Sequence, residues 1–285
     1  MTRKIEKAGL VIKPHAPNIE NILVEVRRLL EGKGIACILE EVASLRLREH
    51  SGVRREDLPA RVDLVVVLGG DGTLLSIAAP AARSGVPVLG VNLGRLGFLT
   101  EVPLDEISLA LDAYLAGNEE IVNSRSLLET RYRGQTYLCL NDVVINKGAV
   151  ARMIQLALWI NDKEIAVLKA DGLIISTTTG STAYALSAGG PIVDPHIPAV
   201  ILAPICPHTF SFRPMVVSAD SRVRIQLLTA GEEVYLTLDG QRGVPLAKND
   251  IVEAGCSGLK LKLISSPRRN YFDLIRDKLG WGALK

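Results

Sequence analysis

The sequence predicts an α/β domain, with a parallel sheet and helices on both faces, followed by a β-rich, sandwich-like domain. Residues 1–120 alternate short apolar runs of strand-forming residues with apolar residues at helical spacing, which is the pattern of parallel strands joined by crossover helices. From about Glu120 onward, stretches with a period of two, separated by turn residues, replace that pattern. Such stretches indicate antiparallel strands in packed sheets.

In the first domain, strands are predicted at residues 8–12, 35–39, 62–68 and 87–91, and helices at residues 19–30 and 104–115. Gly32 and Gly34 end the first helix. Residues 46–59 are interpreted as a polar connection. Because parallel sheets of this kind bind ligands beyond the carboxyl ends of their strands, the residues that follow each strand are the candidates for a site.

In the second domain, hairpins are predicted from residues 127–132 and 136–145, and from residues 154–160 and 164–168. Further strands are expected at residues 222–228, 233–238 and 259–264. Residues 271–279 outline a short final helix after the break at Ser265-Ser266-Pro267. Because its apolar stripe must leave water, we expect this helix to pack on the first domain.

Composition narrows the function classes. The chain has 285 residues, of which 48% are hydrophobic, enough for one large core or two domain-sized ones. A formal charge of +2 without a Lys/Arg-rich block argues against nucleic acid. No apolar run is long enough to span a bilayer and the start does not resemble a signal peptide, so we expect a cytoplasmic protein with no membrane partner. The four scattered cysteines and four isolated histidines suggest no metal or redox motif.

The strongest chemical signal is the sequence Gly69-Gly70-Asp71-Gly72-Thr73, where the third strand gives way to a helix. Glycines permit positive φ and close approach of a ligand, and the amides of such a turn can hold phosphate oxygens. Asp71 would repel a phosphate unless it bound a metal ion or took a proton from an attacking hydroxyl. Taken alone, the turn favours an ordinary connection with Asp71 as a helix N-cap.

Three further stretches place polar residues in unusual settings. Residues 92–100, Asn-Leu-Gly-Arg-Leu-Gly-Phe-Leu-Thr, suit a loop that closes over a base or ribose, and a plain turn with a core Phe98 fits them as well. Asn141 and Asp142 interrupt an apolar strand, so one of them should meet a buried partner, either backbone or a ligand. Residues 169–191 run from a strand into a loop of hydroxyl residues around Gly180, for which a linker is the weaker interpretation.

Together these four stretches resemble the NAD kinase family, the enzymes that phosphorylate NAD to NADP, over nearly the whole chain. The sequence at residues 69–73 also occurs in related lipid kinases, but the combination is more specific. The resemblance implies an α/β domain over residues 1–120, rejoined by residues 268–285, a β-sandwich over residues 121–267, and an active site between the domains. Thr178 stands where the family usually has proline, which predicts a slightly looser loop.

The resemblance also implies roles for residues. Asp71 becomes the catalytic aspartate, as general base or through a metal, and the phosphate cradle is formed by Gly70, Gly72 and Thr73. Asn141 and Asp142 resemble the pair that holds the adenosine of NAD. The other implied NAD-binding positions are Phe98 beside the adenosine, Asp171 on the nicotinamide side, and Lys169, Thr179, Thr182, Ala183, Tyr184, Ser187 and Gln241. The last follows Asp239 and Gly240, a pair for which a hairpin turn is the simpler interpretation.

Phosphoryl transfer to the adenosine ribose 2′-hydroxyl requires positioning, a metal that neutralises phosphate charge, and a carboxylate that accepts the hydroxyl proton. No Walker lysine motif is present, so Mg²⁺ or another divalent metal must supply much of the positive charge, with no protein ligand assigned to it. ATP is the expected donor and polyphosphate the alternative. The resemblance and the many apolar period-two segments imply self-association as a dimer or tetramer.

Two other functions remain as alternatives. A lipid kinase of the same superfamily would share residues 69–73, but the sequence lacks the amphipathic basic helix expected of a membrane-surface enzyme. A non-catalytic module that senses dinucleotides would bind NAD without any ATP-dependent product. One assay for NADP formation separates all three.

Overall fold

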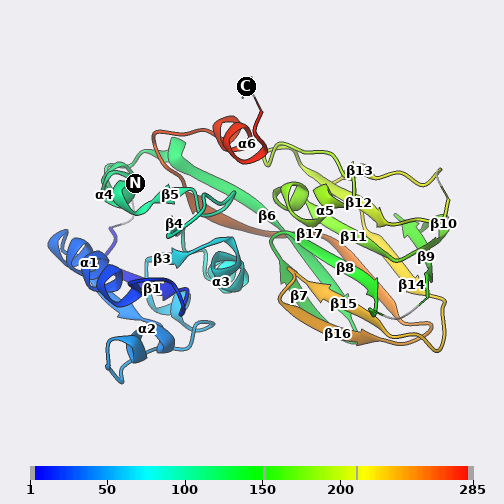
Figure 1. Ribbon diagram of the computed structural model, residues 1–285, viewed down its shortest axis with the longest axis horizontal. Helices are drawn as coiled ribbons and strands as arrows, with labels where there is room; N and C mark the ends of the chain where they lie inside the picture. Colours follow the sequence, from blue (N-terminus) through cyan, green and yellow to red (C-terminus); the bar gives the residue numbers. More distant parts are fainter. Residues whose placement is uncertain (1–3, 150–151, 210, 282–285) are drawn as a thin grey trace. The chain divides into compact units, whose positions relative to one another are not determined.

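The computed structural model describes residues 4–149, 152–209 and 211–281, and the chain forms two compact units (Figure 1). Unit 1 comprises Met1–Ser124 and Leu261–Lys285, and unit 2 comprises Arg125–Lys260. The predicted fold class is confirmed, because unit 1 is an α/β structure and unit 2 is built from antiparallel sheets. Residues 1–3 and 282–285, at the outer limits of the predicted first domain, lie outside the described residues.

Unit 1 is organised around a parallel sheet. Strands β1 (Lys7–Ile12), β2 (Ala36–Leu39), β3 (Leu64–Gly69) and β4 (Val88–Asn92) lie in the order β2-β1-β3-β4, each parallel to its neighbour. The short β5 (Val102–Pro103) and the last residues of β17 (Ile251–Ile264) also pair with β4 in parallel. From β1 the chain places β2 on one side, and it then places β3 and β4 on the other side. The ligand crevice of such a sheet is expected where the strand order changes side, at the carboxyl ends of β1 and β3.

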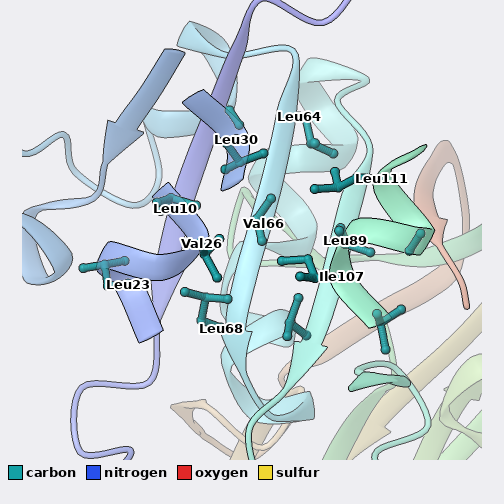
Figure 2. Packing of buried hydrophobic residues seen from close by; sticks show 14 of the residues in the cluster. Leu10, Leu23, Val26, Leu30, Leu64, Val66, Leu68, Leu89, Ile107 and Leu111 are labelled. Atoms are coloured by element: carbon teal, nitrogen blue, oxygen red, sulfur yellow. The ribbon is translucent and has the colours of Figure 1, made fainter. Parts of the chain in front are cut away.

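Helices cover both faces of this sheet. Figure 2 shows Leu23 and Val26 of α1 (Ile19–Gly32), together with Ile107 of α4 (Ile107–Leu115), lying against Val66 and its neighbours on one face. The opposite face is covered by α3 (Asp71–Ser84), whose Leu74 approaches Gly90 of β4. All six residues of β3 are buried, which explains why this strand is apolar throughout instead of alternating.

Short helical turns lie between β2 and β3, in and beside the segment predicted as a polar connection. Helix α2 (Glu41–Arg46) precedes it and the 3-10 turn η1 (Leu58–Arg61) follows it. The sequence pattern did not indicate either, because six and four residues are too few to display a helical period. Two more 3-10 turns, η2 (Leu104–Glu106) and η3 (Glu119–Ile121), flank α4.

Unit 2 contains two antiparallel sheets with a shared apolar core. One sheet has the order β13 (Met215–Ser218), β12 (Ala199–Ile205), β11 (Gly172–Thr177), β8 (Asp142–Lys147), β15 (Val234–Leu238) and β16 (Arg242–Leu246). The other includes β10 (Lys163–Ala170), β9 (Ile154–Ile160), β14 (Val223–Leu227), the first part of β17, and the hairpin of β6 (Val122–Tyr132) with β7 (Gln135–Cys139). Strands β12, β13 and β16 were not predicted.

One predicted strand is wrong. Residues 136–145 form two strands, β7 and β8, that belong to different sheets, with the break at Leu140 and Asn141. The hairpin predicted from residues 154–168 is confirmed as β9 and β10, and its turn residues Asn161 and Asp162 have the positive φ values, 50° and 64°, that tight hairpin turns require. Asn141 and Asp142, at this break, line a pocket that belongs to the candidate site.

The final helix α6 (Tyr271–Leu279) belongs to unit 1. Asn270 and Asp273 form a capping box at its start, and Leu274 and Ile275 on its inner side are buried. The chain before it is fixed by Ser266, which donates from its backbone to Glu101 at 3.2 Å and from its hydroxyl to Glu106 at 2.7 Å. Within the described ranges, no helix is long and apolar enough to cross a membrane.

Candidate active-site residues

The turn between β3 and α3 is extended at Gly70, with φ −125° and ψ −175°, and α3 begins directly at Asp71. Gly70 is therefore the N-cap, and neither it nor Gly69 or Gly72 has a positive φ, so the first of the two predicted reasons for these glycines, a positive φ, is wrong. The space around each glycine explains its presence instead. A Cβ on Gly69 would lie 2.6 Å from Thr73 Oγ1, whereas at Gly70 and Gly72 it would meet nothing within 4 Å. The space beside Gly70 and Gly72, where a side chain would stand, is unoccupied.

The Asp71 carboxylate is the anchor of residues 98–100. Its Oδ1 accepts from Leu99 N at 3.1 Å and from the backbone and hydroxyl of Thr100, both at 2.9 Å. Its Oδ2 accepts from Phe98 N at 2.9 Å. Because a carboxylate offers about four lone-pair positions in all, Oδ1 is fully occupied and Oδ2 retains capacity for one further donor or a metal ion.

The loop at residues 92–100 is shaped by Asn92, whose buried side chain accepts from Gly94 N at 2.6 Å and donates to the carbonyls of Arg95 and Thr100. Helix α6 holds the loop from another direction. Lys278 Nζ donates to the carbonyl oxygen of Leu96 at 2.6 Å and lies 5.7 Å from the centre of the Phe98 ring. The loop is thus fastened at Asn92, at Asp71 and at α6.

In unit 2, the break between β7 and β8 is fixed by Asp239 in the turn joining β15 to β16. Its carboxylate accepts from the backbone N–H groups of Leu140, Asn141 and Asp142 at 2.8, 2.7 and 3.1 Å. Asp239 and Gly240 have φ values of 48° and 65°, so the hairpin-turn interpretation of this pair is correct. Asp239 thus fixes the backbone of Asn141, which lies nearly a hundred residues away in the sequence. The sequence did not reveal this contact.

The loop rich in hydroxyl groups supports the same break from the other side. Thr177 donates from its backbone to Asn141 O at 2.8 Å and from Oγ1 to Leu140 O at 2.6 Å, and Ser176 Oγ donates to Asn141 O at 3.1 Å. A Cβ on Gly180 would lie 2.2 Å from Asn141 O. These hydroxyls therefore bind protein backbone. Thr178, where proline was expected, is buried and donates to Pro195 O at 3.3 Å.

A pocket of about 320 Å³ opens beside this supported break, within the size range of small-molecule sites. Four of the residues predicted to bind NAD lie on it together: Asn141, Asp142, Ala183 and Tyr184. Its other lining residues are Val144, Asn146, Thr237, Asp239 and Gly240. Alternation along β8 places residues 142, 144 and 146 on one face, but the pairing with β15 that brings Thr237 and Asp239 beside them could not be predicted locally.

Two buried carboxyl groups give this pocket its electrostatic character. Burial, reinforced by the nearby charge of Asp239, raises the pKa of Asp142 to about 7. Burial also raises the pKa of Asp239, although its three backbone N–H donors oppose that shift. Near neutral pH the Asp142 carboxyl group is therefore present in both protonation states. The Asn141 side-chain amide makes no hydrogen bond within the described part of the chain and remains available to a ligand.

The other predicted NAD-binding residues do not line this pocket. Thr179 and Thr182 lie in the 3-10 turn η4 (Thr179–Thr182), where Thr182 Oγ1 donates to Thr179 O at 3.3 Å. Ser187 is exposed at the end of the short helix α5 (Tyr184–Ser187). The remaining positions are Gln241, exposed in the β15–β16 turn, Lys169, exposed on β10, Asp171, which pairs with Lys147 Nζ at 3.6 Å, and Phe98, which lies in unit 1.

A nucleotide-dependent phosphotransferase needs a turn that phosphates can approach and a pocket for a nucleoside. Unit 1 has a strand-to-helix turn with unoccupied space beside its glycines, and unit 2 has a pocket of suitable size. Comparison with known proteins gives the family. The model of the ATP-NAD kinase N-terminal domain matches residues 8–119, and that of the ATP-NAD kinase C-terminal domain matches residues 140–266. The chain therefore belongs to the NAD kinase family, and it is an enzyme that phosphorylates NAD.

Individual relatives agree along nearly the whole chain. It is 42% identical over 282 residues to the NAD kinase of Geobacter sulfurreducens, covering 98% of this chain and 99% of that one, and 43% identical over 282 residues to the NAD kinase of Solibacter usitatus, covering 98% of each. Among solved structures, yeast NADH kinase complexed with NADH matches with a TM-score of 0.87 and 26% identity, over 99% of this chain and 90% of that one. An Archaeoglobus fulgidus NAD kinase in complex with ATP matches with a TM-score of 0.78 and 26% identity, over 95% and 98%.

Proposed function

We propose that this NAD kinase transfers the terminal phosphoryl group of ATP to the 2′-hydroxyl of the adenosine ribose of NAD. In this proposal unit 1 handles the phosphates and unit 2 holds the adenosine. The observation that carries it is the setting of Asp71, a carboxylate at the head of α3 beside two glycines with unoccupied space where a side chain would stand. The complexes of the two solved relatives, one with NADH and one with ATP, support both substrates.

In unit 1, the amino-terminal turn of α3 favours negative charge, because the backbone N–H groups and the helix dipole point toward that end. Gly70 and Gly72 leave space for phosphate oxygens, and we assign the Thr73 hydroxyl to the same cradle, because the Thr73 N–H group already donates to Gly70 O at 2.9 Å. Asp71 Oδ2 is the atom with remaining acceptor capacity. We assign to this oxygen the interaction with the attacking hydroxyl, as general base, or with the metal ion.

A divalent metal fits this arrangement. Mg²⁺ is commonly held by one or two carboxylates together with substrate phosphates. Across residues 4–149, 152–209 and 211–281, no three His, Cys, Asp or Glu side chains come together to hold a metal ion. Asp71 Oδ2 would thus be the protein oxygen for such an ion, whose bound charge would neutralise the transferring phosphate.

In unit 2, we assign recognition of the adenosine to Asn141 and Asp142. Both line the pocket, the backbone of Asn141 is fixed from two sides, and its side-chain amide is available. The Asp142 carboxyl group can accept from an amine or hydroxyl of the nucleoside, and Ala183 and Tyr184 also line the pocket. By resemblance, roles along the rest of the dinucleotide are proposed for Phe98, Lys169, Asp171, Thr179, Thr182, Ser187 and Gln241.

The test is a direct assay of purified protein with NAD and Mg²⁺, offered either ATP or polyphosphate, with the product measured by an NADP-specific dehydrogenase. We expect NADP with ATP. Binding of NAD without any NADP would instead support a dinucleotide-sensing module, and phosphorylation of diacylglycerol without NADP would support a lipid kinase. Product formed only with polyphosphate would overturn the assignment of ATP as donor.

We also propose a cytoplasmic homo-oligomer, a dimer or tetramer. Ile165 and Val167 are exposed on β10, which lies at the edge of its sheet. An edge strand with exposed apolar side chains is a ready surface for a second copy. Light scattering at micromolar concentration should show a mass above that of one chain, and a monomer alone would rule the proposal out.

A further inference from the structure

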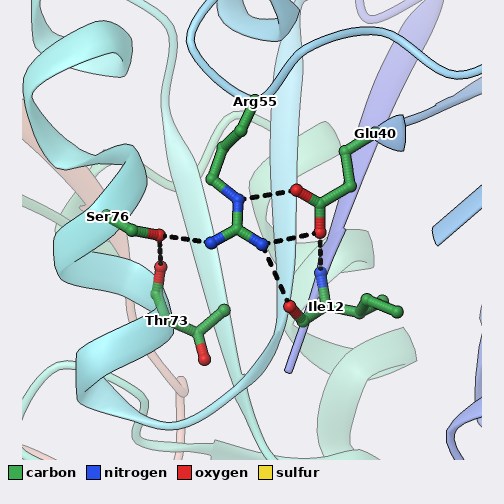
Figure 3. Close-up of polar contacts among 5 residues, drawn as sticks. All are labelled: Ile12, Glu40, Arg55, Thr73 and Ser76. Carbon is green, nitrogen blue, oxygen red and sulfur yellow. Dashed lines mark hydrogen bonds and ion pairs between the residues drawn. The ribbon is translucent and has the colours of Figure 1, made fainter. Parts of the chain in front are cut away.

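Arg55 lies in the connection between β2 and β3 and belongs to none of the sequence motifs described above. Its side chain contacts residues at the ends of β1 and β2 and in α3. Its Nε and Nη2 donate to the two carboxylate oxygens of Glu40 at 2.6 and 2.9 Å, and Nη2 also donates to Ile12 O at 3.2 Å (Figure 3). Its Nη1 donates to Ser76 Oγ at 2.8 Å. We infer that Arg55 is a positioning residue, which holds the phosphate-handling turn of α3 in place relative to the ends of β1 and β2.

On the sheet side, the contacts fix the point where β1 ends. Glu40 follows β2, is only 1% exposed, and accepts from Ile12 N at 2.7 Å with the same oxygen that receives Arg55 Nη2. Both peptide groups of Ile12 are thus engaged, its N–H by Glu40 and its carbonyl by Arg55. A buried carboxylate requires a charged partner with matching geometry, which the planar guanidinium supplies through two N–H groups.

On the helix side, the contacts reach the phosphate cradle itself. Ser76 Oγ accepts from Arg55 and donates to Thr73 O at 2.6 Å (Figure 3). Thr73 is the last residue of the proposed cradle, one turn before Ser76 on α3. The guanidinium is therefore one side chain away from the backbone of the turn, and it does not need to touch a substrate to influence it.

The need for such a link follows from how α3 packs. Three of the five buried residues of α3 are alanines, and the other two, Leu74 and Ile77, are large, but apolar contacts of either kind are non-directional. A hydrogen-bonded link has a defined direction and length. It therefore sets the position of the helix amino terminus at the crevice between β1 and β3, where a displacement of about 1 Å can cost about a hundredfold in rate.

The inference rests on the proposed role of the turn, so the test compares variants of the link, at Ser76 and Arg55, with a variant of the turn, at Asp71. Ser76→Ala cuts the link to α3 but leaves the buried Arg55–Glu40 pair. Arg55→Lys keeps the charge beside Glu40 but cannot reach three partners at once. We expect each to lower kcat/KM for ATP by about 10- to 100-fold and to leave KM for NAD within about twofold, and we expect Ser76→Ala, which leaves the Arg55–Glu40 pair intact, to keep a melting temperature close to that of the wild type. The double variant should be no worse than the worse single one, because both remove the same link.

Arg54→Ala is the matched control. Arg54 is the exposed neighbour of Arg55, and its ion pairs are with Glu56 and Asp57. It should leave all kinetic parameters unchanged. Full activity of folded Ser76→Ala, or losses that simply add in the double variant, would overturn the inference. A loss seen in Asp71→Asn but not in Ser76→Ala would overturn it while sparing the proposed function, whereas normal activity of both variants would overturn both.

Discussion

Asp71 uses its two oxygens differently, and this difference links the loop at residues 92–100 to the chemistry. Oδ1 holds the loop through three donors, whereas Oδ2 has one. A residue that only took a proton would not need such anchoring, and a purely structural residue would not leave an acceptor position beside an open turn. The geometry explains why the same side chain can shape the loop and still interact with a substrate.

Gly97→Ala tests whether the anchoring matters. A Cβ at Gly97 would lie 2.0 Å from Asp71 Oδ1 and 2.6 Å from Thr100 Oγ1, so the carboxylate or the loop must move. We expect NADP formation to fall by roughly 10- to 100-fold, because a small displacement of a catalytic group is enough for such a loss. Gly94→Ala is the control in the same loop, since its Cβ would meet nothing within 4 Å. Equal activity of the two variants would contradict the anchoring role.

Asp142 gives the protein a pH dependence with a defined sign. Its pKa is raised from 3.8 to about 7 in the folded protein, mainly by burial. Between about pH 4 and pH 7 the folded state therefore binds more protons than the unfolded state, so this group lowers the free energy of unfolding as the pH rises through that window. Asp142→Asn removes the dependence, and its melting temperature relative to the wild type should rise from pH 5 to pH 8.

The control for that experiment is Asp162→Asn, at an exposed position in the β9–β10 turn. Its melting temperature should track that of the wild type at each pH. If the difference between Asp142→Asn and the wild type is the same at pH 5 and pH 8, burial of Asp142 does not shift its titration as described.

At the scale of elements, α6 belongs to unit 1 although most of that unit lies more than a hundred residues earlier in the sequence. It buries Leu274 and Ile275 and fastens the loop through Lys278. Deleting residues from 268 onward should lower the free energy of unfolding by about 3–6 kcal/mol, from the loss of two buried aliphatic side chains. A truncated protein that melts at the same temperature and stays fully active would show that α6 does not serve this role.

Local patterns sufficed for β1, β2, β3 and β4 of unit 1 and for the turn at Asp71, because periodicity and glycines carry that information within a few residues. They failed where distant pairing decides the structure. The split at Asn141 depends on Asp239, and no local signal shows that the two meet. Strand β12 was not predicted, although it is apolar and buried on both faces like β3, with Ala203 packed near Ala185 of α5.

For the whole molecule, the proposal divides the substrates between the two units, and this division makes a kinetic prediction. Asn141→Ala should raise KM for NAD by roughly tenfold or more, because loss of a buried polar contact leaves its partner on the ligand unpaired. KM for ATP should change by less than about twofold. Comparable changes for both substrates would indicate a folding defect, which a thermal melt of the variant would reveal.

The central claim is that Asp71 takes part in the phosphoryl transfer, and turnover of Asp71→Asn with NAD and ATP at several Mg²⁺ concentrations tests it most directly. Asn keeps the size, and its amide oxygen can still accept from Leu99 and Thr100, whereas its NH2 group cannot accept from Phe98 N, so the variant should fold with a somewhat lower melting temperature than the wild type. If Asp71 is the general base, turnover should fall by about 10²- to 10⁴-fold at every Mg²⁺ concentration; if it acts through the metal, excess Mg²⁺ should restore part of the activity. A folded Asp71→Asn protein with near-normal turnover would contradict the account.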